Sequence, residues 1–203
     1  MQYIVPEEAR EFLKAKDARM RRLILYGQAP REYIIEDAFK ALVDIIVGQQ
    51  ISEKAKAAIL SRVKAAFPTM DQRTFESLAE EDLTALGLSR MKASTIIRLA
   101  KSDEDFNALK QEDKRTVKKK LTAFKGIGMW TVEMFYFIAM QDEDVLSLRD
   151  MGIRNALKTL YDCSDKDLPA FKPYFSPHGS AASAYLWTML ALDDETIQTI
   201  KGA

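Results

Sequence analysis

Residues 121–132 read Leu-Thr-Ala-Phe-Lys-Gly-Ile-Gly-Met-Trp-Thr-Val. Two glycines, Gly126 and Gly128, separate a helical pattern that starts near residue 112 from a second one that continues to residue 140. Glycine accepts a positive φ and lets another backbone come close, and exposed amides at the N-terminus of a helix suit a phosphate group. The stretch therefore predicts two helices joined by a phosphate-binding turn, with a plain helical corner as the alternative.

Apolar residues recur at helical spacing along nearly the whole chain, and runs typical of strands are lacking. Pro6 opens a first helix, and Asp17 begins a second that ends near Gly27. The other expected helices span residues 37–48, 52–67, 75–87, 89–101, 112–123, 129–140, 150–161, 180–192 and 193–201. The fold class that we expect is all-α, with about ten helices.

Length and composition exclude several classes of protein. The chain has 203 residues, no net charge, one cysteine and one histidine, so we expect a single domain, residues 1–203, rather than a globally basic nucleic-acid binder. One cysteine cannot form a disulfide framework, an iron–sulfur site or a Cys/His zinc site, and we expect no cofactor. The N-terminus lacks the apolar core of a signal peptide and no apolar run reaches 18 residues, which favours a cytoplasmic chain.

Charge is nevertheless segregated along the chain. Residues 114–125 hold six basic side chains and no acid, and residues 84–101 hold four more, whereas residues 71–82 carry five acids. The ten basic residues are Lys114, Arg115, Lys118, Lys119, Lys120 and Lys125, with Arg90, Lys92, Arg98 and Lys101. They form either solvated helix faces or one phosphate-binding face.

The sequence resembles the helix-hairpin-helix superfamily of base-excision DNA glycosylases, and within it the 3-methyladenine DNA glycosylase II family. Residues 124–128, Phe-Lys-Gly-Ile-Gly, match the hairpin pattern L-P-G-[IV]-G, with Lys125 in place of the usual proline, and Asp150 follows about twenty residues later. Three further segments agree, residues 42–52, 87–93 and 176–187. The resemblance covers roughly residues 36–192. It implies two helical lobes with an active-site cleft between them, without the extra N-terminal β domain of longer members.

The resemblance implies that Asp150 is the catalytic residue. Cleavage of an N-glycosidic bond builds positive charge on the sugar, which a nearby carboxylate stabilises while it orients the attacking water. An alkylated purine is already a cationic leaving group, so a strong general acid is less necessary. An aspartate before a helix is also a common N-cap, and we expect Asp150 to serve both roles.

The resemblance also implies residues that bind DNA. Electron-rich aromatic rings attract a cationic base, and the matching positions of the base pocket are Trp130, Trp187, Tyr136 and Tyr185, although Met134 stands where some relatives have tyrosine. Gln50 matches the wedge that fills the gap left by a flipped base, with a polar helix connector as the alternative for Gln49 and Gln50. Lys125, Gly126 and Gly128 would hold the phosphate backbone. In relatives the turn binds a monovalent cation through carbonyls, here those of Thr122, Phe124 and Gly126.

The predicted activity is that of a monofunctional DNA glycosylase. Bifunctional relatives carry a Schiff-base lysine just after the hairpin, where this sequence has Trp130. We therefore expect hydrolysis only, on double-stranded DNA that contains alkylated bases, by a monomer located at the nucleoid. A bifunctional glycosylase/lyase and a non-catalytic helix-hairpin-helix DNA-binding module remain the alternatives.

Overall fold

A computed structural model describes residues 2–3, 5–30 and 33–202. The chain divides into two compact units, which we describe separately. Unit 1 comprises the described residues between 35 and 140, and unit 2 comprises those before residue 35 and after residue 140. Within the described part of the chain, none of the helices is long and apolar enough to cross a membrane.

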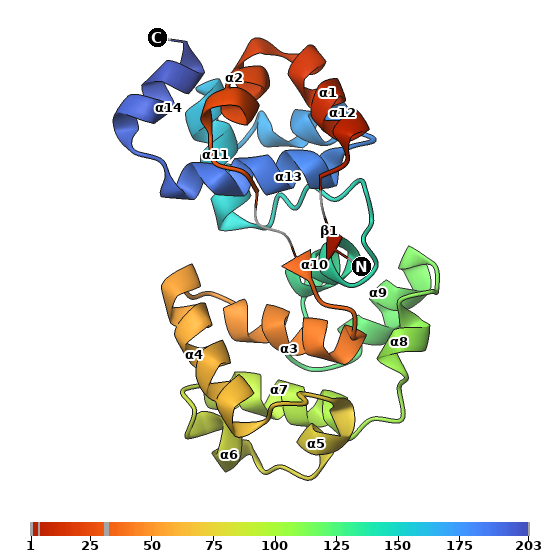
Figure 1. Ribbon diagram of the computed structural model, residues 1–203. Coiled ribbons are helices and arrows are strands. Elements are labelled where there is room, and N and C mark those ends of the chain that lie inside the picture. Colours follow the sequence, from red (N-terminus) through yellow and green to blue (C-terminus); the bar gives the residue numbers. More distant parts are fainter. Residues whose placement is uncertain (1, 4, 31–32, 203) are drawn as a thin grey trace. The chain divides into compact units, whose positions relative to one another are not determined.

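Unit 1 is built around α3 (Ala38–Gly48; Figure 1). Most residues of this helix are buried. Phe39 of α3 lies between Phe75 and Phe106, with ring centroids 5.6 and 6.1 Å away. Around α3 pack α4, α7, α8 and α10, while α9 packs against α10 and both α5 and α6 pack against α7. The helices of this unit are α3 (Ala38–Gly48), α4 (Glu53–Ala66), α5 (Gln72–Glu76), α6 (Glu80–Thr84), α7 (Arg90–Ala100), α8 (Phe106–Leu109), α9 (Lys114–Thr122) and α10 (Met129–Ile138).

Unit 2 joins the N-terminal helices to those that follow residue 140. Helix α13 packs against α1, α11 and α12, and α14 packs against α2 and α11. The helices of unit 2 are α1 (Glu7–Lys16), α2 (Ala18–Tyr26), α11 (Met151–Tyr161), α12 (Phe171–Phe175), α13 (Gly179–Thr188), α14 (Asp194–Lys201), and the 3-10 helices η1 (Leu168–Ala170) and η2 (Met189–Ala191). Two short strands, β1 (Gln2–Tyr3) and β2 (Tyr33–Ile34), pair antiparallel.

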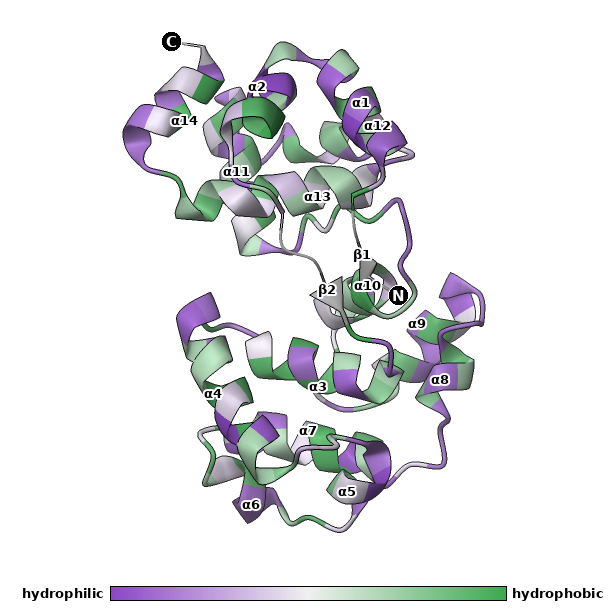
Figure 2. Cartoon of the chain, in the orientation of Figure 1, coloured by the Kyte–Doolittle hydropathy of each residue, from purple (hydrophilic) through white to green (hydrophobic). Residues whose placement is uncertain are grey.

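Local sequence explains where most helices begin. The side chains of Asp17, Ser52 and Ser89 accept backbone N–H groups two or three residues into α2, α4 and α7, as the sequence predicts. Outer helices such as α4 and α9 carry purple polar residues beside green apolar ones in Figure 2, whereas α10 and α13 bury most of their residues. The all-α prediction is confirmed, apart from the one pair of short strands.

Three segments differ from the expectation, and one of them, α8, was not predicted. The helix predicted over 75–87 is two helices, because Asp71 accepts the Thr74 amide and starts α5 early, and Asp82 accepts the Ala79 amide and starts α6 anew. The proline-marked loop is largely helical. Pro169 lies at the second residue of η1 and Pro173 at the third residue of α12, where a missing amide donor breaks no helical hydrogen bond.

Candidate active site

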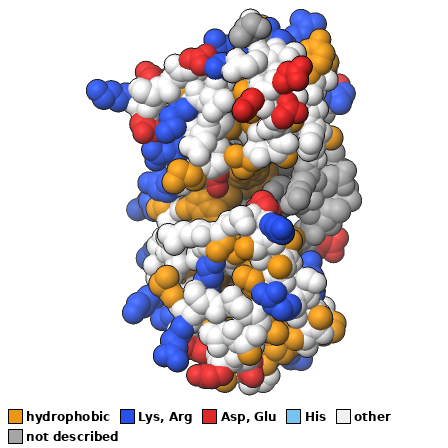
Figure 3. Space-filling view, turned by 90° about the vertical axis from the view of Figure 1, so that its left-hand side faces the viewer, with side chains coloured by type: hydrophobic (Ala, Val, Ile, Leu, Met, Phe, Trp, Pro, Cys, Tyr) orange, Lys and Arg blue, Asp and Glu red, His pale blue; other side chains and the backbone are white. Residues whose placement is uncertain are grey.

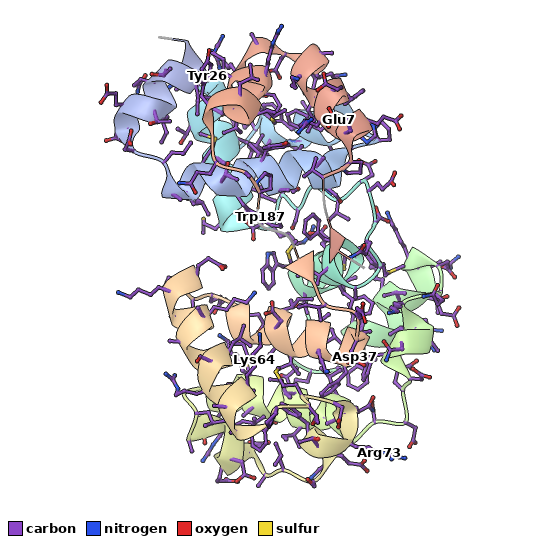
Figure 4. The ribbon with its side chains drawn as sticks, in the orientation of Figure 1. Glu7, Tyr26, Asp37, Lys64, Arg73 and Trp187 are labelled. Carbon is purple, nitrogen blue, oxygen red and sulfur yellow. The ribbon has the colours of Figure 1, made fainter. Side chains whose placement is uncertain are left out.

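Asp150 lies at the N-cap of α11, as the sequence predicts. Its Oδ1 accepts a hydrogen bond from the Ile153 amide at 3.0 Å and a second from Nε1 of Trp187 at 3.0 Å. Trp187 belongs to α13, is labelled in Figure 4, and like Asp150 is half-buried. The indole thus fixes the orientation of the carboxylate from a helix 37 residues further along the chain.

Gly152 makes room for this pair. A Cβ at residue 152 would lie 3.1 Å from Asp150 Oδ1, 3.4 Å from Trp187 Cδ1 and 3.0 Å from Leu190 Cδ1. Leu190 and Met151 are both exposed, although large and apolar. A side chain at residue 152 would therefore press on the Asp150 carboxylate and on the Trp187 indole that holds it.

The predicted hairpin joins α9 to α10 in unit 1. Gly126 has a φ of +101°, and a Cβ there would lie 2.1 Å from Thr95 Oγ1, so this position requires glycine. Ile127 is buried between the two glycines and anchors the turn. Gly128 caps α10 with an ordinary φ of −101°, and a Cβ there would meet nothing within 4 Å. Space therefore remains in front of the first amides of α10, which suits the approach of a phosphate.

The carbonyls expected to bind a cation lie in this turn. The Phe124 carbonyl accepts the Ile127 amide, and the Gly126 carbonyl accepts Nε2 of Gln49 at 3.3 Å. Thr122 is the last residue of α9, where no following helical amide reaches its carbonyl. Since a carbonyl oxygen has two lone pairs, these residues fit a cation of low charge, and the cation itself stays a prediction.

Only some of the basic residues remain available for phosphate. Lys120 forms an ion pair with Glu104 at 2.9 Å, and Nζ of Lys92 donates to two backbone carbonyls. Lys118, Lys119 and Lys125 are exposed. On the face drawn in Figure 3, basic side chains lie on both units with acidic ones among them. Of the ten basic residues, Lys92 and Lys120 are therefore committed to partners within the protein, and the other eight are exposed.

The two glutamines of the α3–α4 turn have different environments. Gln49 is half-buried, and its Nε2 also donates to Thr131 Oγ1 at 2.9 Å. Gln50 is exposed and adopts a left-handed backbone with a φ of +53°. Gln49 is thus the helix connector, while Gln50 is displayed on the surface. The wedge role of Gln50 stays a prediction.

The four predicted pocket aromatics have different degrees of burial. Trp130, the second residue of α10, and Trp187 are half-buried. Tyr136 is buried and its hydroxyl donates to the Lys114 carbonyl at 2.5 Å. Tyr185 is buried in the core of unit 2, and burial raises the pKa of its hydroxyl. Both tyrosines thus contribute to packing, and a pocket role for any of the four stays a prediction.

Sequence reasoning missed four residues that support the site: Lys92, Thr95, Thr131 and Gly152. Thr95 and Thr131 are polar residues on otherwise apolar helix faces, and Gly152 is a glycine inside the first turn of a helix. The buried threonines and the glycine in the helix are features that the sequence alone could have revealed. The structural role of Lys92 could not be predicted in this way, because a lysine at the start of a basic helix is normally predicted to be an exposed surface charge.

Known proteins are similar to this chain in sequence and in fold. The family described as HhH-GPD superfamily base excision DNA repair protein matches residues 43–170. DNA-3-methyladenine glycosylase 1 of Schizosaccharomyces pombe is 28% identical over 202 residues, covering 91% of this chain and 87% of that protein. The DNA-3-methyladenine glycosidase structure from Bacillus halodurans is 30% identical with a TM-score of 0.68, covering 92% of this chain and 91% of that one.

The structure of the S. pombe 3-methyladenine DNA glycosylase in complex with abasic DNA shares the fold with a TM-score of 0.83. It is 24% identical in the structural alignment, which covers 92% of this chain and 98% of that chain.

Proposed function

Because the chain belongs to the HhH-GPD superfamily of base excision DNA repair proteins, we propose that it is a monofunctional DNA glycosylase. It flips alkylated purines out of duplex DNA, hydrolyses the N-glycosidic bond and leaves an abasic site. The observation that carries this proposal is the Asp150 carboxylate, held in one orientation by the Ile153 amide and the Trp187 indole. The names of the similar proteins support alkylated bases as the substrate class.

Asp150 stabilises the sugar cation that forms as the bond from C1′ to the base breaks. The bonding electrons leave with the cationic base, which becomes neutral. A water oxygen then bonds to C1′, and Asp150 orients this water and takes up its proton. Since Trp187 and Ile153 both donate to Oδ1, the carboxylate has its orientation before the sugar arrives.

Duplex DNA is the partner in this proposal. The exposed Lys125, the open approach to Gly128 and the first amides of α10 bind the phosphate backbone. The protein acts as a monomer at the nucleoid in the cytoplasm.

The absence of a lyase step follows from the residue after the hairpin. Trp130 occupies the position where bifunctional relatives carry the Schiff-base lysine, and an indole cannot form an imine with the sugar. Lys125 lies before Gly126 and faces solvent, where it serves the phosphate backbone. The product is therefore an abasic site in an intact strand.

Incubation with alkylated duplex DNA, followed by chromatography of the released bases, tests the activity. Asp150→Asn keeps the shape and the capping oxygen, so its release rate should fall by about a hundredfold or more with folding unchanged. Asp193→Asn is the matched control, because Asp193 caps α14 in the same unit by accepting the Thr196 amide at 2.7 Å.

Borohydride should trap no covalent adduct between the wild-type protein and DNA, and strands should break only after alkali or heat. Release of bases by Asp150→Asn at the rate of Asp193→Asn would remove Asp150 from the mechanism. Efficient trapping would instead establish the bifunctional alternative, and binding without any release would establish the non-catalytic one.

A further inference from the structure

The turn between α3 and α4 displays Gln50 in an unusual backbone. Gln50 is exposed with a φ of +53°, a region that residues other than glycine rarely occupy. Such a conformation persists only where the surrounding structure holds it. Among the described residues, α7, the hairpin and α4, all in unit 1, contribute contacts that hold this turn.

Lys92 of α7 holds the turn from one side. Its Nζ donates to the Val47 carbonyl at 3.0 Å and to the Gln49 carbonyl at 2.6 Å. These carbonyls lie at the C-terminal end of α3, where helical amides no longer reach and a positive charge is favourable. The ammonium therefore fixes the residue directly before Gln50.

The hairpin and α4 hold the turn from the other sides. Gln49 donates from Nε2 to the Gly126 carbonyl and to Thr131 Oγ1, which ties the turn to the hairpin. Lys56 of α4 forms a largely buried ion pair with Asp44 of α3 at 2.5 Å. The same helix α7 also contacts the hairpin, since the Thr95 hydroxyl lies 3.1 Å from the Lys125 carbonyl and shares its hydrogen between that carbonyl and the Met91 carbonyl at 2.8 Å. Helix α7 thus links the turn that carries Gln50 to the turn that carries Gly126.

We propose that Lys92 is a positioning residue for base flipping, which it serves by fastening the turn that presents Gln50 to the DNA. The inference rests on the proposed function. A side chain that enters a base stack must resist being pushed back, and a loose turn would lose conformational freedom at every insertion. Lys92, which the sequence pattern assigns to a basic surface, therefore supports the wedge rather than the phosphate contact.

Two substrates separate this role from a general structural one. One is a duplex with an alkylated purine opposite its normal partner, and the other carries the same base in a bulge without an opposing nucleotide. A base that is already unpaired is easier to extrude, so it depends less on the wedge. Single-turnover release with enzyme in excess is measured on both.

Lys92→Met should lower release from the paired substrate by about tenfold or more, because two hydrogen bonds from a charged donor are lost. Release from the bulged substrate should stay within about threefold of wild type. Lys92→Arg should restore part of the loss, since it keeps the positive charge. Lys64→Met, at an exposed lysine of α4 labelled in Figure 4, should leave both rates unchanged. Equal losses on both substrates, or none on the paired one, would overturn the proposal.

A readout without catalysis keeps the inference separate from the proposed activity. Duplex DNA with a single 2-aminopurine brightens when that base leaves the stack, and the wild-type protein should raise this fluorescence more than Lys92→Met does at saturation. If wild type brightens the probe but releases no alkylated base, the proposed activity fails while the role of Lys92 stands. Should Lys92→Met fail to fold, Gln49→Leu, which removes the contacts to Gly126 and Thr131, must give the same substrate dependence, and its absence overturns the proposal.

Discussion

The two hairpin glycines should respond differently to substitution by alanine, Gly126 by losing stability and Gly128 by losing affinity for DNA. In Gly126→Ala the new Cβ lies 2.1 Å from Thr95 Oγ1 on a backbone with a φ of +101°. The backbone strain costs about 1–3 kcal/mol. Displacement of Thr95 breaks its hydrogen bond to Lys125, which adds about 0.5–1.5 kcal/mol. The free energy of unfolding should therefore fall by about 1.5–4.5 kcal/mol.

Gly128→Ala is the matched comparison two residues away. Its Cβ would meet nothing within 4 Å, and its φ of −101° suits alanine. Alanine stabilises the protein by lowering the conformational entropy of the unfolded chain, but it is a less favourable N-cap than glycine. Because these two effects oppose each other, the free energy of unfolding should change by less than about 0.5 kcal/mol. Affinity for duplex DNA should fall, because the added methyl group occupies the approach to the first amides of α10.

Urea unfolding followed by tryptophan fluorescence measures the stability of unit 1. Trp130 lies in unit 1 and Trp187 in unit 2, so a Trp187→Phe background leaves one reporter in the unit of interest. Thr95→Ala should relieve part of the clash, and the double variant with Gly126→Ala should lose about 1 kcal/mol less than the sum of the single losses. Equal stability of Gly126→Ala and Gly128→Ala would refute the reasoning.

Three further predictions concern the carboxylate, the DNA contact and acid stability. Gly152→Ala should lower the rate of base release about tenfold, because the added methyl group displaces the Asp150 carboxylate. The melting temperature should stay unchanged or rise, because alanine favours a helix more than glycine does. Single-turnover rates and melting curves measure the two effects. Binding to duplex DNA should weaken with salt at a log–log slope of about −3 to −5, as expected for about three to six neutralised phosphates, and a flat titration by fluorescence anisotropy would contradict it. Hydrogen bonds donated by Thr74, Thr116 and Thr196 lower the pKa values of three helix-capping carboxyl groups below 3.8, those of Asp71, Asp113 and Asp193. In acid the unfolded chain therefore binds more protons than the folded protein does. The melting temperature should be constant above about pH 5 and should fall as the pH drops through 3.8.

The sequence alone determined the helical fold and the principal motifs. Helix starts at Asp17, Ser52, Ser89 and Asp150 could be predicted because a cap depends on a side chain and amides two or three residues away. The hairpin could be predicted for the same reason, since glycine spacing is local. The break between α5 and α6 was missed although its signals, Asp71 and Asp82, are also local.

Tertiary structure decided which side chains act together. The sequence does not tell Gln49 from Gln50, but packing against Gly126 and Thr131 commits Gln49 to the hairpin and leaves Gln50 exposed. Lys92 and Lys120 count as surface charges in the sequence, whereas in the fold Lys92 meets backbone carbonyls and Lys120 meets Glu104. Likewise the hydrogen bond from Trp187 to Asp150 joins residues 37 positions apart. Such partners are set by how helices pack, and helical periodicity specifies which face is buried but not which residue lies opposite.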